Sequence, residues 1–475
     1  MTPDALTELV KPAAALAELW SAAQMPAAAL ARLTLEGAEP VVPSSFAIGT
    51  ALQVSLGAAA LAAAELARLR GAPAQQVRVH AADAALESAG RFTLDGRSPE
   101  VWDKLAGLYP CSGGTTPGWV RLHTNFAHHR DGVLQLLGLP TGPSTDRDAV
   151  AAALQAWAAV DFETAAAERG LVVAAVRSPQ EWQQHPQAQA LATLPLVDIA
   201  RLGDAPVPAP AMSSANARPL SGLRVLDLTR ILAGPVAGRT LAAYGADVML
   251  VNSPQLPNIE SIADTSRGKL SAHLDLRSAA DVETLHELVR QSDVFLQGYR
   301  PGALAALGLG PEDLARLRPG IVCVSLSAYG HRGPWAARRG FDSLVQAATG
   351  ISIAEAQAFG SATPRALCLP ALDYGAGFLL AFGALAALHR QQRVGGSWQV
   401  RVSLAGVGRW LTSLGRVPAG PQAVWPSFDA AMEETDSGFG RLAAVRHAAR
   451  FSASTAGWAR PSMPPGSHPP RWPGR

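Results

Sequence analysis

Cysteine is scarce in this chain, which has three in 475 residues: Cys111, Cys323 and Cys368. Their spacing matches neither a set of metal ligands nor a redox pair, so the thiols predict no metal or dithiol site. A reducing cytoplasm is the expected compartment. The N-terminus agrees with this expectation, because it opens with an acidic, helical segment and lacks the charged-then-apolar pattern of a signal peptide.

Charge of either sign is also in short supply. Charged residues make up 16% of the chain, and 40 basic against 38 acidic side chains leave a net charge of +2. No basic field favours nucleic acid, and the aromatic residues do not alternate with lysine and arginine. A membrane span is not expected either: the Ala-rich run Ala58–Ala67 contains Glu65, precedes Arg68 and Arg70, and is typical of a packed helix.

The length and composition indicate a globular protein of two or three domains. The clearest boundary is a stretch with three spaced prolines and small polar residues, which predicts an extended linker at 203–219. The predicted divisions are a helical N-terminal segment with a helix–strand unit (1–95), a small α+β domain (96–202), the linker, an α/β domain (220–410) and a C-terminal extension (411–475). The Pro/Trp/Arg-rich tail from Trp458 is expected to be surface-hugging or disordered.

Strands and helices alternate in the α/β domain. The pattern predicts strands at 223–228, 246–251, 294–297 and 321–326, and helices at 235–244, 279–291 and 311–317. This alternation is typical of a doubly wound parallel sheet, or Rossmann-like fold, whose ligands lie beyond the carboxyl ends of the strands. The first strand-to-helix turn lacks the Gly-x-Gly-x-x-Gly motif of a nicotinamide dehydrogenase.

An internal repeat links the two ends of the chain. Gln76-Val-Arg-Val79 follows an Ala/Leu helix that ends in Arg68 and Arg70, and Gln399-Val-Arg-Val402 follows the Ala/Leu helix Gly377–Arg393. The order of helix, turn and strand is the same in both. This repetition suggests a duplicated or rearranged unit.

One carboxylate stands out in the α/β domain. The run Ala366-Leu-Cys-Leu-Pro-Ala-Leu-Asp373 is apolar until its last residue and continues into Gly375 and Gly377. The pattern predicts an aspartate between a buried strand and a helix. Such a carboxylate can serve as a nucleophile or as a helix cap, and local sequence leaves both roles open.

Five motifs precede this aspartate in the α/β domain. They are Leu223-Arg-Val-Leu-Asp-Leu-Thr-Arg-Ile-Leu-Ala-Gly-Pro235, Tyr244-Gly-Ala-Asp-Val248, Gly298-Tyr-Arg-Pro-Gly302, Ser327-Ala-Tyr-Gly-His-Arg-Gly-Pro334 and Phe341-Asp-Ser-Leu-Val-Gln-Ala-Ala-Thr-Gly350. Over residues 220–410 this series resembles the class III CoA-transferase family (CaiB/BaiF type), which includes formyl-CoA transferase and α-methylacyl-CoA racemase. Residues 109–123 and 173–186 are similar to the family's small domain, which implies a permuted order of the parts. The family's interlocked assembly makes a homodimer a possible state.

The resemblance implies an acyl-CoA:carboxylate CoA-transferase. Its partners are then an acyl-CoA and a carboxylic acid, with coenzyme A as substrate and no metal. Asp373 falls at the family's nucleophilic aspartate and would carry an aspartyl-CoA thioester. The implied CoA contacts, each matched to a family motif or to the nucleophile's surroundings, are Arg230, Ile231, Ala233, Tyr299, Arg300, Arg339 and Gly375.

The sequence departs from the family at several points. Asn252, Ser253 and Ala306 stand where charged or cationic residues are usual, which favours a catalytically impaired CoA-binding homologue as one alternative. An acyl-CoA racemase or epimerase is the other, but Phe341 replaces that branch's histidine and cannot move a proton.

Less specific interpretations compete with several of these assignments. An arginine at a strand end is often an ion-paired surface group, and Tyr299 suits a core position as well as an adenine slot. Asp342 is expected to cap the helix that starts at it, the alternative being a hydrogen bond near the nucleophile. His128-His129-Arg130 lacks a second ligand cluster, so a structural or surface role is expected there.

Overall fold

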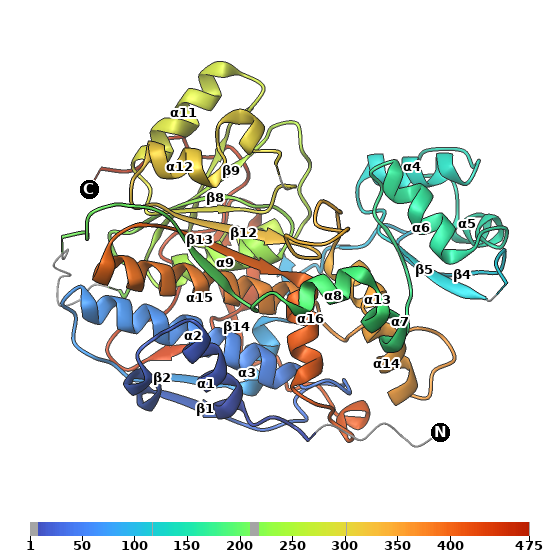
Figure 1. Ribbon diagram of the computed structural model, residues 1–475, viewed down its shortest axis with the longest axis horizontal. Coiled ribbons are helices and arrows are strands. Elements are labelled where there is room, and N and C mark those ends of the chain that lie inside the picture. The colour runs from blue at the N-terminus through green and yellow to red at the C-terminus, as the bar shows by residue number, and fades with distance from the viewer. Residues whose placement is uncertain (1–7, 116, 210–217, 301, 475) are drawn as a thin grey trace.

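A seven-stranded sheet forms the centre of the protein in the computed structural model, which describes residues 8–115, 117–209, 218–300 and 302–474. The strand order is β10-β9-β8-β11-β12-β13-β7 (Figure 1). The strands span Lys269–His273, Asp247–Asn252, Arg224–Leu228, Val294–Gln297, Val322–Ser327, Ser397–Ser403 and Asp198–Gly203 in that order. All neighbours are parallel except β13 and β7, which are antiparallel. The predicted α/β fold with a mostly parallel sheet is confirmed.

Both faces of this sheet are covered, which explains why all five residues of β8 are buried. Val225 points into the core that contains α9 (Ala233–Ala243) and α15 (Ala371–Val394). Leu226 points to the opposite face, where α11 (Ala279–Arg290) and α12 (Pro311–Leu317) pack. Successive side chains of the strand therefore point to opposite faces of the sheet and pack into two separate cores.

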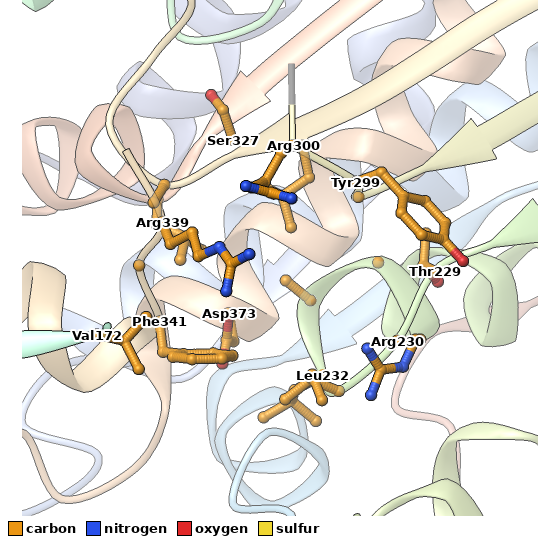
Figure 2. Close-up of a pocket in the computed structure, with 18 of the residues that line it drawn as sticks. Val172, Thr229, Arg230, Leu232, Tyr299, Arg300, Ser327, Arg339, Phe341 and Asp373 are labelled. Carbon is orange, nitrogen blue, oxygen red and sulfur yellow. The ribbon is translucent and has the colours of Figure 1, made fainter. Parts of the chain in front are cut away.

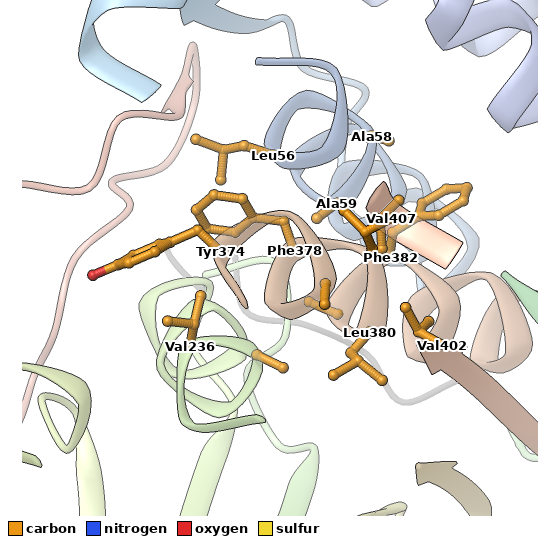
Figure 3. Packing of buried hydrophobic residues seen from close by; sticks show 14 of the residues in the cluster. Leu56, Ala58, Ala59, Val236, Tyr374, Phe378, Leu380, Phe382, Val402 and Val407 are labelled. Carbon is orange, nitrogen blue, oxygen red and sulfur yellow. The ribbon is translucent and has the colours of Figure 1, made fainter. Parts of the chain in front are cut away.

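The larger core is built around two long helices, α2 (Ile48–Leu69) and α15, which pack against each other (Figure 3). Small side chains such as Ala58 and Ala59 of α2 let Phe378 and Phe382 of α15 approach closely. Among the described residues, these two helices are long and apolar enough to cross a membrane, but nearly all of their residues are buried inside the protein. The segment predicted as a short helix at 58–67 is thus part of a helix twice that length.

A smaller antiparallel sheet, β4 (Gly107–Cys111), β5 (Gly118–Leu122) and β6 (Val173–Ala175), lies to one side of the molecule in Figure 1. The helices α4 (Ala127–Leu136), α5 (Arg147–Leu154) and α6 (Ala159–Glu168) cover it and complete a separate core. The chain then passes through α7 (Pro179–Gln184) and α8 (Pro186–Ala192) into β7 of the large sheet. The predicted linker at 203–219 lies partly outside the described residues, and the domain boundaries stay a prediction.

The C-terminal extension returns to the N-terminal part of the chain. The hairpin β14 (Met432–Ser437) and β15 (Gly440–Val445) pairs with β3 (Phe92–Leu94), and β16 (Arg450–Phe451) pairs with β2 (Val77–His80). The tail then runs along the large sheet, where the Trp472 ring is buried and its Nε1 donates to the carbonyl of Leu288 at 3.1 Å. It is a surface-hugging segment, one of the two expected states.

A buried ionic cluster holds this extension in place. The Arg239 guanidinium of α9 contacts the carboxylates of Glu87 and Asp264, and Arg267 bonds the same Asp264. His447 Nδ1 lies 3.0 Å from Glu87 Oε1, and the amide of Ala448 donates to Glu87 Oε2 at 2.8 Å. His447 and Arg239 hold the pKa of the Glu87 carboxyl at about 2 against the opposing effect of burial.

The remaining elements are short or lie around the long helices. They are α1 (Pro12–Ala22), η1 (Ala27–Arg32), β1 (Leu33–Glu36), α3 (Ala81–Glu87), α10 (Ile262–Thr265), η2 (Ala305–Leu307), α13 (Asp342–Ala348), α14 (Ile351–Ala358), α16 (Leu404–Ser413) and η3 (Gly420–Gln422).

Candidate active site

A cavity of about 410 Å³ opens at the carboxyl ends of β8, β11 and β12, where a doubly wound sheet places its ligands. The loop after β8 lines it with residues 228–234, the loop after β11 with residues 298–300, and the loop before α13 with residues 338–341. The remaining lining residues include Asp373 and, from the small sheet region, Phe126, His128, His129 and Val172. Figure 2 shows Asp373 facing this space.

Asp373 lies in the first turn of α15, and the strand predicted before it is absent. Residues 361–370 form turns and loop, and α15 begins at Ala371 directly after Pro370. The proline fixes its own φ and suits a helix start, which overrides the β-like run of apolar residues. Asp373 is not the cap of its own helix either, because Pro370 holds that position.

The start of α15 is capped by Asp342 instead. Asp342 Oδ2 accepts hydrogen bonds from the amides of Leu372 at 2.9 Å and Asp373 at 3.0 Å. Its other carboxylate oxygen accepts from Gln346 Nε2. The expectation that Asp342 caps α13 is wrong, since that helix has no side-chain cap. The alternative, a hydrogen bond beside the nucleophile, is what the structure shows.

The two carboxyl groups perturb each other. Burial, followed by the nearby charge of Asp342, raises the pKa of Asp373 well above its ordinary value. Burial also raises the pKa of Asp342 to about 6, although the amides of Asp373 and Leu372 act in the opposite direction. A carboxylate that is poorly solvated when ionised is a stronger nucleophile than one in water.

The loop after β8 is held in an unusual conformation by buried groups beneath it. Thr229 donates from its amide at 2.9 Å and from its hydroxyl at 2.5 Å to Asp227 Oδ1. The Lys269 ammonium is fully buried and donates to Asp227 Oδ2 and to the carbonyl of Pro235, each at 2.8 Å. These bonds support Ile231 at φ 75°, a region that β-branched residues rarely adopt.

Three arginines at the cavity have no carboxylate partner among the described residues. Arg230 bonds the carbonyl of Pro257 and lies 5.6 Å from the Phe126 ring centroid, while Arg339 bonds the carbonyl of Gly170 at 3.2 Å. Burial lowers the pKa of the Arg339 guanidinium, and the nearby positive charge of Arg300 adds to this effect. In Figure 2 the Arg300 and Arg339 side chains extend toward the space next to Asp373. An unpaired cluster of cations indicates an anion site.

The neighbouring Arg338 is different from these three. Its guanidinium lies 3.4 Å from the Glu163 carboxylate and 4.1 Å from the centroid of the Trp335 ring. That charge is already compensated by the protein, so Arg338 offers little to an anionic ligand.

Of the other residues predicted to contact CoA, three line the cavity and one does not. Ile231, Ala233 and Tyr299 line the cavity, and burial raises the pKa of the Tyr299 phenol. Gly375 is not among the lining residues: it faces Val407, whose Cγ1 would lie 3.0 Å from an added Cβ. Because α15 starts before Asp373, a residue two positions later points to the opposite side of the helix. Gly377, one turn after Asp373, is the glycine on the same face of the helix as Asp373.

Gly377 permits the closest approach between the two helices at the site. A Cβ there would lie 2.6 Å from Val236 Cγ1 and 2.7 Å from the carbonyl oxygen of Ala233, the first residue of α9. The start of the helix that carries Asp373 is therefore packed directly against the start of α9, whose first amides have no partner within the helix.

The histidines of the small sheet region were missed as site residues. His128 and His129 line the cavity, whereas a structural or surface role was expected. His129 is 4% exposed, and no described residue is a hydrogen-bond partner of its Nδ1. The His123 ring stacks on Phe341 with the ring centroids 3.9 Å apart. Burial lowers the pKa of His129 to about 4, so its imidazole is neutral at pH 7. In the sequence, the one signal for this placement was that His128 and His129 follow closely on the segment 109–123, which resembles the family's small domain.

Among the described residues, no group of three or more His, Cys, Asp or Glu side chains is arranged to hold a metal ion. The three cysteines are free thiols.

Residues 220–423 match the model of CoA-transferase family III. The matched segment runs from just before β8 to just after η3, contains every strand of the large sheet except β7, and includes Asp373, Arg230, Arg300 and Arg339.

Curated proteins similar to the chain are named as transferases of CoA. An acyl-CoA transferase of Gibberella moniliformis is 35% identical over 303 residues, which cover 60% of this chain and 53% of the relative. A probable fatty acyl-CoA transferase of Mycobacterium tuberculosis is 34% identical, covering 40% and 52% of the two chains. Human succinyl-CoA:glutarate CoA-transferase is 32% identical, covering 38% and 43%. The chain thus spans about half the length of these relatives.

Two solved structures share part of the chain. The crystal structure of the Mycobacterium tuberculosis protein has 34% identity and a TM-score of 0.39, covering 42% of this chain and 57% of that one. A CaiB/BaiF family protein from Brucella suis has 25% identity and a TM-score of 0.37, covering 48% and 65%.

Proposed function

Residues 220–423 of this chain belong to CoA-transferase family III, and from that premise we propose that the protein transfers CoA between carboxylic acids through Asp373. The observation that carries the proposal is the position of Asp373. Its carboxylate lies at the start of α15, faces the cavity, and shares that cavity with three arginines that have no carboxylate partner in the described part of the chain. The site therefore combines a nucleophile with a place for the phosphates of CoA.

The first half of the proposed reaction forms a thioester on the protein. The ionised Asp373 carboxylate attacks the thioester carbonyl of the donor, the C–S bond breaks, and CoA leaves as a thiolate. The thiolate then attacks the Asp373 carbonyl of the resulting mixed anhydride and releases the donor as a carboxylate. Asp373 is left as an aspartyl-CoA thioester, and no proton is gained or lost overall.

The second half repeats these steps in reverse with the acceptor. Its carboxylate attacks the aspartyl thioester, the thiolate leaves, and a new mixed anhydride links Asp373 to the acceptor. Attack of the thiolate on the acceptor carbonyl forms the product acyl-CoA and restores the Asp373 carboxylate. The same carboxyl group is thus both nucleophile and leaving group.

Each acyl step develops negative charge on a carbonyl oxygen, and the site contains donors for it. Ala233 and Gly234, the first two residues of α9, line the cavity, and their amides belong to the positive end of the helix dipole. Gly377 holds Asp373 next to them by allowing close helix packing. Preorganised donors of this kind typically contribute about 3 kcal/mol each to such a transition state.

Arg230, Arg300 and Arg339 are proposed to bind the phosphates, with Tyr299 beside the nucleotide. Asn252, Ser253 and Ala306 stand where the family usually has charged residues. In this proposal the three arginines supply the positive charge for the phosphates from other positions of the cavity. The relatives' names span fatty acyl and dicarboxylic acyl groups, so the acyl group stays open. A cytoplasmic location belongs to the same proposal.

Trapping the covalent intermediate tests the proposal. The protein is incubated with a series of acyl-CoAs, treated with hydroxylamine or borohydride, digested and analysed by mass spectrometry. We expect a hydroxamate or an alcohol at Asp373 in the wild type and none in Asp373→Asn, with CoA transfer reduced at least about 1000-fold in the variant. Binding of CoA without an adduct from any acyl-CoA would contradict a transferase, and α-proton exchange in D₂O without transfer would indicate a racemase.

A further inference from the structure

The N-terminal unit repeats the architecture of the unit that carries Asp373. In both, a long apolar helix lies between two parallel strands: α2 between β1 and β2, and α15 between β12 and β13. The repeated Gln-Val-Arg-Val sequences align Val77 with Val400. On this alignment the strand pairing also corresponds, because Leu33 pairs with Val77 and Val324 pairs with Val400.

The third strand of each unit pairs with the same positions. β16 lies antiparallel to β2, with Phe451 opposite Val77 and Arg450 opposite Arg78. β7 lies antiparallel to β13, with Ile199 opposite Val400 and Asp198 opposite Arg401. The next helix also begins at the same point of both units, α3 at Ala81 and α16 at Leu404, each capped by the side chain before it.

The same alignment places Thr50 where Asp373 stands. The separation from Thr50 to Gln76 equals that from Asp373 to Gln399, and each residue is the third of its helix. A carboxylate caps both helices at this residue: Glu39 Oε1 accepts from the amide of Thr50 at 2.8 Å, as Asp342 Oδ2 accepts from that of Asp373. The two units therefore agree in the carboxylate that caps the long helix as well as in the pairing of their strands.

The two units also complete each other. β7, from the segment that precedes the α/β domain, is the edge strand of the large sheet in the unit that contains Asp373. β16, from the C-terminal extension, is the edge strand of the N-terminal sheet. Phe126, His128 and His129, which come before β7 in the chain, form one wall of the Asp373 cavity. α2 and α15 pack together between the units, and the Trp20 ring of α1 stacks on the Phe382 ring of α15 with the ring centroids 5.8 Å apart.

We propose that residues 12–87 are a shortened first copy of the catalytic unit, inactive because Thr50 replaces the nucleophile, and that this copy serves as a partner within the same chain. One chain is then the complete catalyst, with one reactive carboxylate. Under this proposal the order of the parts reflects a shortened first copy followed by a second one and needs no permutation. The part concerning reactivity rests on the proposed function, whereas the part concerning assembly does not.

Four measurements on the protein test the inference. Light scattering coupled to size exclusion should give the mass of one chain, and the transfer rate per chain should stay constant on dilution from micromolar to low nanomolar concentration. Trapping should give one adduct per chain, at Asp373. Thr50→Val, which keeps the shape of the side chain, should keep kcat within about twofold, while Asp373→Asn loses transfer.

The outcomes separate the two proposals. A dimer whose activity per chain falls on dilution would overturn the partner within the same chain, as would a second adduct within residues 12–87. Loss of transfer in Thr50→Val with an unchanged melting temperature would overturn the inactivity of the first copy. Absence of any adduct in the wild type would contradict the transferase alone, because the mass measurement does not depend on catalysis.

Discussion

At the scale of single residues, the pair Asp342 and Asp373 determines how the site behaves. Asp342 orients the nucleophile by accepting hydrogen bonds from the first turn of α15, but its charge also disfavours ionisation of Asp373. The two effects can be separated, because an asparagine at 342 keeps an acceptor oxygen and loses the charge. We regard Asp342 as a positioning residue.

Asp342→Asn is expected to change the pH dependence of transfer. The reaction needs ionised Asp373, so kcat/KM of the wild type rises with pH as the coupled pair titrates. Removing the neighbouring charge lowers the pKa of Asp373, and the acid limb of the profile should move to lower pH. Steady-state rates from pH 4.5 to 8.5 measure this. Asp342→Ala is the control, which should lose activity at every pH because the amides of Leu372 and Asp373 lose their acceptor.

At the scale of elements, the site depends on the contact between the first two turns of α15 and the start of α9. α15 brings Asp373 and α9 brings the amides of Ala233 and Gly234, and the contact between them is made at Gly377. The loop that joins β8 to α9 is held from below by the buried Lys269–Asp227 pair. The geometry of the reacting groups is thus fixed by packing and by buried polar bonds, as catalysis requires.

Gly377→Ala should therefore damage transfer far more than Gly375→Ala. The added methyl at 377 would lie 2.7 Å from the Ala233 carbonyl oxygen, so the start of α9 must move away from Asp373. At 375 the nearest atom is a side-chain methyl of Val407 at 3.0 Å, which can shift. We expect at least a 10-fold loss in kcat for Gly377→Ala and about twofold for Gly375→Ala. Equal losses in the two variants would contradict this account of the helix contact.

Sequence reasoning succeeded where local pattern determines structure and failed where tertiary contacts do. Strand β11 and helix α12 have the predicted bounds, because a glycine follows the apolar strand and a proline begins the helix. The predicted strand before Asp373 does not exist, since Pro370 starts a helix there. The cap made by Asp342 and the wall made by His128 and His129 bring together residues far apart in sequence, which no local pattern reveals.

At the scale of the whole molecule, buried charges join the C-terminal extension to the rest. Glu87 from the N-terminal unit, Arg239 from the large sheet region and His447 from the extension meet in one water-excluded cluster. A buried ion pair is strongly destabilising to break, because the remaining charge is left without compensation. The cluster therefore couples the unfolding of three distant segments.

Glu87→Gln should destabilise the protein by about 3 kcal/mol at pH 7, against about 0.5 kcal/mol for Glu434→Gln in the exposed pair with Arg441. The folded-state pKa of Glu87, about 2, is below its ordinary 4.5. The stabilisation is therefore present above pH 4.5 and is lost as the pH falls toward 2. Urea unfolding followed by tryptophan fluorescence should show the gap between wild type and Glu87→Gln closing from pH 7 to pH 3. A gap independent of pH would contradict the assignment.

The pairing of β2 with β16 has a consequence for how the chain is made. β2 is complete when residue 80 leaves the ribosome, but its antiparallel neighbour β16 begins only at Arg450, some 370 residues later. The N-terminal unit must therefore wait while all of these residues are made, with one open strand edge and an unfinished apolar interior. Nascent chains are thus expected to need protection by chaperones until β16 has been made, and chains that stall or terminate before β16 are expected to aggregate.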